Sequence, residues 1–304
     1  MFLKHMDLRG WSNIDQKRAG VNGYKAEVTL NRRTAELGRA AGRIFEREGI
    51  FRIKDITVEM ARAEIKALNL SGYSSGTISG YSKALSDAHQ IVHGTPVDFG
   101  SLVPSRSSDA PTDGRAYLQP HIKEIIANQP PVYGLMTEVV YEGALRVSEI
   151  NNLRPAAEFP AQISEQRLSQ LVDYRFSGRE GVYYTVTGKG GLDRTIILGE
   201  ELSERLEAFR LDETRMIKSE RGEDGRSFEQ HYDFPSGEEW AKNFSVTSKD
   251  LFSWSRGAHG LRHSRVQELV KSFQEQGFTW DQSRLAVSQE IGHFRVSEIN
   301  TYLR

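Results

Sequence analysis

The sequence predicts a mainly α-helical protein with a small antiparallel β-sheet, an α+β fold built as two domains. Apolar residues recur at helical intervals over most of the chain, whereas one short stretch is rich in β-branched and aromatic residues. Residues 96–113 gather proline, serine, glycine and aspartate with little apolar periodicity, which is typical of a linker. A length of 304 residues suits two domains with a core each, which we place at 1–104 and 114–304, joined by a linker at 105–113.

The first domain is predicted to be entirely helical. Apolar residues at helical spacing indicate three helices, each with a polar start signal or a glycine after its last turn. They run from Tyr24 to Glu48 before Gly49, from Asp55 or Thr57 to a stop before Gly72, and from the Ser74–Ser75 cap to His93–Gly94.

The second domain is predicted to open with helices, pass through a β-hairpin and return to helices. The hairpin strands are residues 181–187 and 195–198, and the glycine-rich stretch Gly188 to Gly191 forms their turn. Helices are expected at 118–128, 132–145, 200–211, 263–273 and 282–291, with a polar loop at 220–229.

Composition excludes several classes of protein. The chain has no cysteine, which rules out disulfides, thiol nucleophiles and cysteine-ligated zinc and fits a reducing interior. Charged residues interrupt the N-terminal stretch, so it is not a signal peptide, and no apolar run reaches membrane-spanning length. We therefore expect a cytoplasmic protein with no membrane partner.

The net charge of −1 conceals a basic N-terminal part. Residues 1–54 hold roughly 12 Lys and Arg against 6 Asp and Glu, which leaves about −7 for the remainder. Several of these arginines lie on the first predicted helix, where they could neutralise phosphates and make binding salt-dependent. A solvated helix face explains the same charges equally well. The arginines are Arg32, Arg33, Arg39, Arg43 and Arg47.

Six residues far apart in the sequence become candidates for one site only when they are taken together. Singly, each has a plain structural explanation: an arginine paired with Glu149 on the same turn, a solvated lysine at a turn, a histidine at a helix end, a packed tyrosine. The six are Arg146, Lys189, His259, Arg262, His293 and Tyr302.

The spacing of His259 and His263 raises a separate possibility, because histidines four residues apart on a helix can bind zinc. The metalloprotease version of that pattern has a glutamate directly after the first histidine, where this chain has Gly260. We therefore expect no metal site.

The set resembles the active-site signature of the tyrosine recombinase and phage integrase family. Residues 143–150 (GALRVSEI) resemble its first arginine box, and 187–190 (TGKG) its hairpin lysine. Residues 259–264 (HGLRHS) resemble its histidine–arginine box, while 291–293 (IGH) and 299–302 (INTY) resemble its last histidine and its nucleophile. The N-terminal helices, with 74–83 (SSGTISGYSK), resemble the family's SAM-like core-binding domain. The resemblance covers nearly the whole chain and implies a C-shaped clamp on DNA.

The chemistry of a phosphodiester explains why such a set is needed. Two guanidinium groups, of Arg146 and Arg262, can hold the non-bridging oxygens, and His293 can add a hydrogen bond. Tyr302 has to lose its proton on attack, with His259 as base or hydrogen-bond partner. The resemblance implies a 3′-phosphotyrosyl intermediate that stores the bond energy, so the reaction needs no cofactor and no metal.

Two further roles complete this hypothesis. Lys189 is the candidate general acid for the leaving 5′ hydroxyl, because desolvation beside DNA can lower a lysine pKa. Glu149 is expected to orient Arg146 or a neighbouring histidine.

The resemblance also implies the partners. These are double-stranded DNA with an inverted-repeat core site, a second protomer, and a synaptic tetramer formed by two such dimers. Candidate DNA contacts in the first domain are Arg32, Arg33 and Lys83, which are chosen by charge and helix placement, and plain surface residues are the alternative. The biological role can be integration and excision by a mobile element, transposition or resolution.

Two other functions stay open at the level of sequence. A type IB topoisomerase uses a similar set of residues to relax supercoils, and a non-catalytic DNA-binding protein could keep the recombinase fold. The chain also departs from the family pattern. Residues 277–282 look like an insertion, residues 155–181 fit poorly, and many relatives continue past the tyrosine into a helix. No arm-binding domain is expected at the front.

Overall fold

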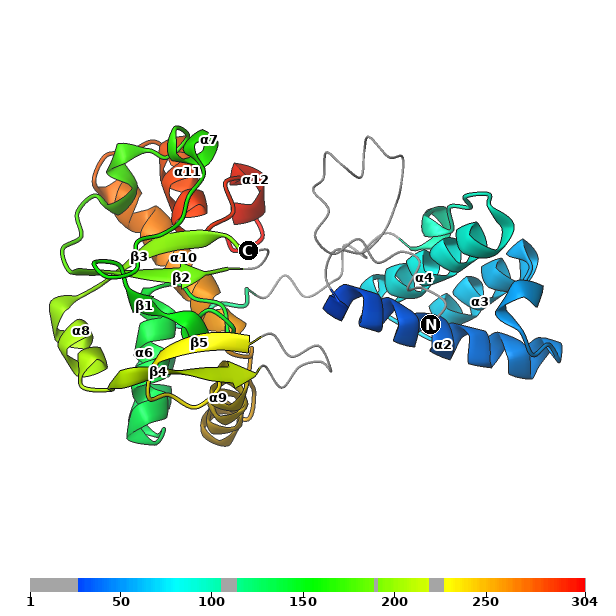
Figure 1. The fold of residues 1–304 in the computed structure, drawn as a ribbon, viewed down its shortest axis with the longest axis horizontal. Coiled ribbons are helices and arrows are strands. Elements are labelled where there is room, and N and C mark those ends of the chain that lie inside the picture. The colour runs from blue at the N-terminus through cyan, green and yellow to red at the C-terminus, as the bar shows by residue number, and fades with distance from the viewer. Residues whose placement is uncertain (1–26, 105–113, 189–190, 219–226, 304) are drawn as a thin grey trace. The chain divides into compact units, whose positions relative to one another are not determined.

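The computed structural model describes residues 27–104, 114–188, 191–218 and 227–303, which fall into two compact units. The first unit holds residues 27–104, and the second holds the other three ranges (Figure 1). In these ranges no helix combines the length and the apolar character that crossing a membrane requires.

The first unit is a helical bundle in which the three predicted helices are confirmed. The helix ends coincide with local signals: Thr57 and Ser74 side chains accept from main-chain N–H groups of the first turn, and Gly94 adopts a left-handed conformation at φ 71°. The apolar faces meet in one core around Ile44, Ile65 and Ile78. The helices are α2 (Glu27–Glu48), α3 (Val58–Leu70) and α4 (Ser75–His93), with short 3-10 turns η2 (Ile53–Asp55) and η3 (Gly100–Leu102).

Residues 96–104 have the composition of a linker but pack on the first unit, in agreement with the predicted domain boundary at residue 104. Phe99 is fully buried, and Val97, Leu102 and Val103 pack against the core of the first unit. These apolar residues stand among prolines and glycines without helical spacing, so periodicity does not reveal them although they bury well. Residues 105–113 lie outside the described residues.

The second unit combines a three-stranded antiparallel sheet with helices, as an α+β fold requires (Figure 1). The strands are β1 (Arg154–Pro155), β2 (Val182–Thr187) and β3 (Asp193–Leu198), in the order β1-β2-β3. The longer helices are α5 (Gln119–Ala127), α6 (Pro131–Glu142), α8 (Glu200–Glu207), α9 (Gly237–Phe252), α10 (His259–Glu275) and α11 (Trp280–Glu290). Short elements are η4 (Ile150–Asn152), α7 (Glu165–Leu168), η5 (Asp173–Phe176) and α12 (Val296–Ile299).

The predicted β-hairpin is confirmed as β2 and β3. Their register pairs Thr187 with Asp193, and Gly188 N–H donates to the Leu192 carbonyl at 2.7 Å. Lys189 belongs to this hairpin but lies outside the described residues.

Three predicted elements of the second unit were partly wrong. The helix expected at 200–211 ends at Glu207, and a second hairpin follows, β4 (Arg210–Lys218) with β5 (Ser227–Tyr232). The loop expected at 220–229 therefore already contains strand from Ser227 on. The helix expected to reach residue 145 ends at Glu142, because Ala144 has a positive φ of 47° that no helix accommodates.

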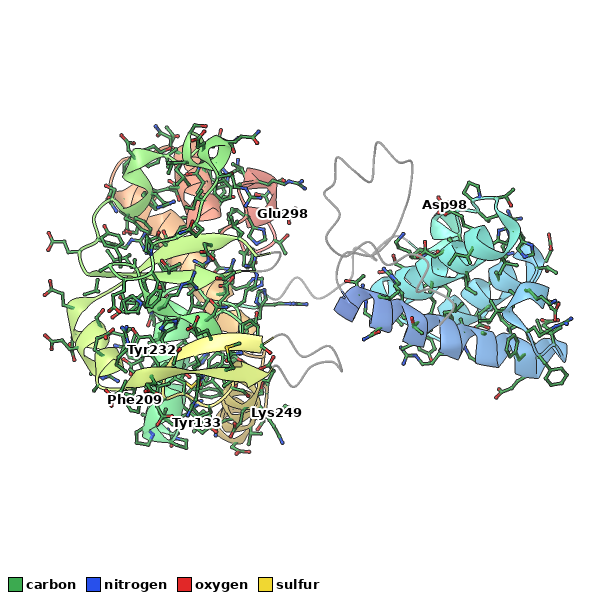
Figure 2. The ribbon with its side chains drawn as sticks, viewed as in Figure 1. Asp98, Tyr133, Phe209, Tyr232, Lys249 and Glu298 are labelled. Atoms are coloured by element: carbon green, nitrogen blue, oxygen red, sulfur yellow. The ribbon has the colours of Figure 1, made fainter. Side chains whose placement is uncertain are left out.

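Two apolar cores position the site in the second unit. The larger lies between the sheet, α6 and α9, and includes Tyr232 (Figure 2), whose hydroxyl donates to Glu207 at 2.7 Å. The smaller joins α10, α11 and α12 and includes Tyr302. Ala144 belongs to the smaller core, so the turn after α6 lies against the helices that carry the candidate residues.

Candidate active site

The turn after α6 holds Arg146 and Glu149 together. Glu149 is fully buried, and its carboxylate accepts from Arg146 twice, from the main-chain N–H at 2.9 Å and from Nη1 at 2.7 Å. The predicted pairing of these two residues is therefore present. Gly188, the residue after β2, lies close to this pair. A methyl group added to Gly188 would lie 3.1 Å from Glu149 Oε1 and 3.7 Å from Arg146 Nη1. The hairpin thus approaches the pair closely at this residue.

Three guanidinium groups surround the Glu149 carboxylate. Besides Arg146, Arg194 on β3 donates to Oε2 at 2.7 Å, and Nη1 of Arg262 on α10 lies 3.5 Å from the same oxygen. Burial raises the pKa of the Glu149 carboxyl, but the charges of Arg194, Arg262 and Arg146 outweigh it and lower that pKa to about 2. Glu149 is therefore ionised at neutral pH.

Arg262 is fully buried in the first turn of α10. Its guanidinium donates to the carbonyl of Ala144 and, through Nη2, to the carbonyl of Ile291 at 2.7 Å. Burial lowers the pKa of this guanidinium to about 10, with Arg146 and Arg194 acting in the same direction and Glu149 against them. Nε finds no hydrogen-bond partner among the described residues, so one buried donor of this guanidinium is unsatisfied in the unbound chain.

The Tyr302 phenol lies against histidines. Tyr302 is 6% exposed, and its hydroxyl is 3.2 Å from Nε2 of His293. Its ring centroid lies 4.7 Å from that of His263 and 5.8 Å from that of His259. The main-chain carbonyl of Tyr302 accepts from Gln267 on α10 at 2.8 Å. Both the ring and the main chain of the tyrosine are thus held by α10.

The three histidines are neutral at neutral pH. Burial lowers the pKa of His259, His263 and His293 to about 4 each, and nearby arginine charges add to the effect. Nε2 of His293 also lies 3.0 Å from Nη2 of Arg146. Because a guanidinium can only donate, Nε2 is the acceptor, and the proton of the neutral ring is on Nδ1.

The structure brings most of the sequence-predicted residues together and adds two. Residues 146, 149, 259, 262, 293 and 302 form one cluster. Lys189 falls outside the described residues, between Gly188 and Gly191. Arg194 carried no signal of its own in a strand. His263 was considered only as a zinc ligand, and the described residues hold no group of three or more histidine or acidic side chains suited to a metal ion.

Residues 155–181, which had no assigned role, brace the end of α11. Gln289 accepts from Val172 N–H at 2.8 Å and donates to the Gln170 carbonyl at 2.7 Å. Arg179 forms a buried ion pair with Glu290. The stretch that leads from α11 to His293 is therefore fixed from this side. The predicted insertion at 277–282 begins α11 with a capping box between Thr279 and Gln282.

The candidate DNA contacts of the first unit differ in accessibility. The side chains of Arg32 on α2 and Lys83 on α4 are 61% and 55% exposed. Arg33 is only 11% exposed and donates to Glu36 and to the Gly80 carbonyl, so its guanidinium joins α2 to α4. A surface groove between these helices is lined by Arg32, Glu36, Arg39, Ser74, Gly76, Thr77 and Tyr81.

The fold is that of the tyrosine recombinases and integrases, although the sequence matches no protein-family model and no curated protein. A lambda integrase dimer bound to a COC′ core site aligns with a TM-score of 0.59 at 16% identity, over 95% of this chain and 92% of that chain. A lambda integrase tetramer bound to a Holliday junction gives 0.58 at 15% identity, over 95% and 75%. The Tn1549 transposon integrase with transposon right end DNA gives 0.56 at 13%, over 96% and 92%.

Proposed function

We propose that this chain is a tyrosine-type site-specific DNA recombinase that cleaves and rejoins DNA through a 3′-phosphotyrosyl bond to Tyr302. One observation carries the proposal: the phenol lies in a cluster where three guanidinium groups share one carboxylate, that of Glu149, among the described residues. The neutral histidines leave this cluster with surplus positive charge. Buried surplus charge is costly without a counter-ion, and a DNA phosphodiester is an anion whose charge grows in the transition state.

Attack begins with an exchange of hydrogen bonds at His293. In the unbound chain Arg146 occupies the Nε2 lone pair. An incoming phosphate oxygen takes the Arg146 donor, which frees Nε2 to accept the phenol proton of Tyr302 across the 3.2 Å contact. This assigns the proton-accepting role to His293, where the sequence suggested His259. His259 then packs beside the phenol, at ring-contact distance.

In the cleavage step the Tyr302 oxygen replaces the 5′ oxygen of the next nucleotide on the phosphorus. The Tyr302 oxygen forms the new bond to phosphorus, the bond to the 5′ oxygen of the next nucleotide breaks, and that oxygen takes a proton from Lys189. The close approach of Gly188 to the Arg146–Glu149 pair supports this role for the hairpin. The unsatisfied Nε donor of Arg262 suits one non-bridging oxygen. A 5′ hydroxyl from a second DNA reverses the steps and rejoins the strand.

The first unit supplies sequence-independent affinity for the DNA backbone. Its groove exposes Arg32 and Arg39 beside the hydroxyls of Ser74 and Thr77, groups that bind phosphate oxygens. Lys83 on α4 adds a further exposed cation. The lambda integrase structures are a dimer bound to a COC′ core site and a tetramer bound to a Holliday junction, and we expect this chain to assemble on DNA as a dimer and as a tetramer in the same way. We further propose that its core site is an inverted repeat and that two dimers form the synaptic tetramer.

A nicked suicide substrate tests the proposal, because loss of a short fragment traps the covalent complex. Wild-type protein should form a protease-sensitive adduct with a free 5′ hydroxyl on the released fragment, and Tyr302→Phe should form none. Tyr183→Phe, an exposed tyrosine on β2, is the matched control and should react as wild type does. Equal adduct from wild-type and Tyr302→Phe protein contradicts the assignment of the nucleophile.

Two further substrates separate recombination from the related activities. A plasmid with two core sites should yield recombinant products, whereas a topoisomerase would relax a supercoiled plasmid without them. A wild-type chain that binds the core site but forms no adduct on it is a non-catalytic DNA-binding protein.

A further inference from the structure

Arg194 connects three elements of the site although it lies outside the recognised signature. It stands on β3, opposite Val186 in the hairpin that contains Lys189. Its side chain is 4% exposed. Nη2 donates to Glu149 at 2.7 Å and Nη1 donates to the Glu290 carbonyl, at the end of α11, at 2.7 Å. One guanidinium therefore joins the hairpin, the Arg146 turn and α11.

Each contact of Arg194 fixes a partner of a proposed catalytic residue. Its bond to Glu149 holds the carboxylate that receives two bonds from Arg146. Its bond to Glu290 holds the last turn of α11, two residues before Gly292. Gly292 adopts φ 78°, and a methyl group there would lie 3.1 Å from Arg194 Cδ, so the chain that enters His293 runs directly along the arginine.

The planar fork of arginine is what this position requires. A lysine ammonium is a single point and cannot span the carboxylate of Glu149 and the carbonyl of Glu290 with the same geometry. A methionine fills similar space but leaves Glu149 with two guanidinium partners, those of Arg146 and Arg262, of which Arg262 lies at 3.5 Å. The carboxylate is then free to turn towards Arg262 and away from Arg146.

We propose that Arg194 is a positioning residue, which holds Arg146 through Glu149 and His293 through the end of α11 in the geometry that receives the phosphate. The inference rests on the proposed function for its catalytic consequence. The hydrogen bonds of Arg194 go to Glu149, to the Glu290 carbonyl and to the Ala144 carbonyl, so the proposed role is positioning and not contact with substrate.

The kinetic test compares Arg194→Met, Arg194→Lys and the control Arg205→Met on the suicide substrate. Arg205 on α8 forms a surface ion pair with Glu138 and should leave adduct formation unchanged. Misplacement of a phosphate-binding group by about 1 Å costs about a hundredfold in rate, so Arg194→Met should lose about that factor. Arg194→Lys should recover only part of the loss, because it restores charge without the fork. DNA affinity should change little, since the Arg194 side chain is only 4% exposed.

The pH profile separates positioning from simple loss of structure. The charge of Arg194 helps to keep the pKa of the Glu149 carboxyl low, and the other groups that face this carboxyl are Arg262 on α10, Arg146 on its own turn and His293 after α11. The charge of Arg194 also helps to lower the pKa of His293 to about 4, and because this value lies above that of Glu149, His293 sets the acid limb of the adduct rate. Without Arg194 both pKa values rise, so the acid limb should move to higher pH in Arg194→Met and stay in place in Arg205→Met. An unmoved limb overturns the proposal.

A crystal structure of unbound Arg194→Met protein decides the inference independently of activity. Arg146 should leave its 2.7 Å contact with Glu149 or its 3.0 Å contact with His293. If both contacts persist in Arg194→Met, Arg194 positions neither residue. Absence of any adduct from wild-type protein would instead remove the proposed function and leave this structural result standing.

Discussion

Arginines in the two units share buried carboxylates in different ways. In the first unit Glu64 is 1% exposed and pairs with Arg43 and Arg47, whose side chains remain 34% and 37% exposed. In the second unit the partners of Glu149 include Arg194 and Arg262, which are almost fully buried. The partly exposed arginines of the first unit stay hydrated, so water screens their charges. The buried arginines of the second unit are desolvated, so their electrostatic interactions with one another and with Glu149 are stronger.

The difference teaches that the number of charges does not locate the site. The basic excess of the sequence lies in residues 1–54, yet the buried cationic cluster lies in the remainder, which carries about −7. We therefore expect substitutions in the second unit to alter stability and chemistry, and substitutions in the first unit to alter affinity and its salt dependence.

The largest effect is expected for Arg262→Met. The variant leaves Glu149 less compensated and two main-chain carbonyls without their donor, so the free energy of unfolding should fall by about 3–5 kcal/mol. Adduct formation should fall by about a thousandfold, the upper range for loss of one transition-state donor. Denaturant titration and the suicide substrate measure the two effects. Arg262→Lys keeps the positive charge and serves as a second variant in case Arg262→Met does not fold. A wild-type adduct rate in either variant would contradict the expectation that buried arginines of the second unit determine the chemistry.

Acid should act in opposite directions on the buried histidines of the second unit and on the buried Asp87 of the first. His259, His263 and His293 have pKa values of about 4 in the folded chain and 6.5 ordinarily, so the stability they contribute above pH 6.5 is lost as pH falls towards 4. In the first unit, burial raises the pKa of Asp87 from 3.8 to about 6, so its contribution is present below pH 3.8 and is lost as pH rises through 6.

Calorimetry between pH 7.5 and 4 measures this contrast as two transitions. Tryptophan fluorescence of Trp11→Phe protein identifies the transition of the second unit, because the three remaining tryptophans, Trp240, Trp254 and Trp280, all belong to that unit. Asp87→Asn should remove the opposite trend of the first unit. Parallel shifts of both transitions would contradict the predicted signs.

A smaller effect is expected for Arg39→Ala in the groove of the first unit. Loss of one phosphate contact should weaken DNA binding by about fivefold at physiological salt and reduce the slope of log affinity against log salt by about 0.9. Arg39 Nε also donates to the Tyr81 hydroxyl at 3.1 Å, so the free energy of unfolding should fall by about 1 kcal/mol. The adduct rate at saturating DNA should stay near wild type. Glu46→Gln, a charge change elsewhere on α2, controls for a general electrostatic effect, and equal salt slopes in wild type and Arg39→Ala exclude the groove as a phosphate contact.

The smallest effect is expected for Arg205→Met. This arginine belongs to the second unit but forms a half-exposed ion pair with Glu138, so its removal should cost less than about 1 kcal/mol. Denaturant titration measures it. A loss as large as that of Arg262→Met would show that membership of the unit, and not burial, determines the effect.

The sequence predicted elements whose ends carry local signals. Helices α2 to α4 end or begin at Gly49, Thr57, Ser74 and Gly94, where a single residue satisfies or terminates the helix. The hairpin β4–β5 escaped prediction because β4 is polar and exposed along much of its length, so it lacks the apolar alternation by which strands are recognised. The conformation of β4 therefore depends on its pairing with β5 and not on an apolar pattern in its own sequence.

The candidate site divides in the same way. The signature residues were predictable because each stands in a local motif, and the structure gathers those that it describes. Arg194 and the acceptor role of His293 were not predictable, because both depend on distances between segments about 50 to 150 residues apart in sequence. Only folding brings the β3 guanidinium to the end of α11.

Ala144 has a consequence for which substitutions the turn after α6 tolerates. Its carbonyl accepts from Arg262 and lies 3.4 Å from Nη2 of Arg194, and this orientation depends on a left-handed main chain at an alanine. That conformation costs about 1 kcal/mol, which glycine would relieve. The side chain is fully buried, so any residue larger than alanine would both increase the strain and overfill the core. Natural variation at this position should therefore run only towards the smaller residue.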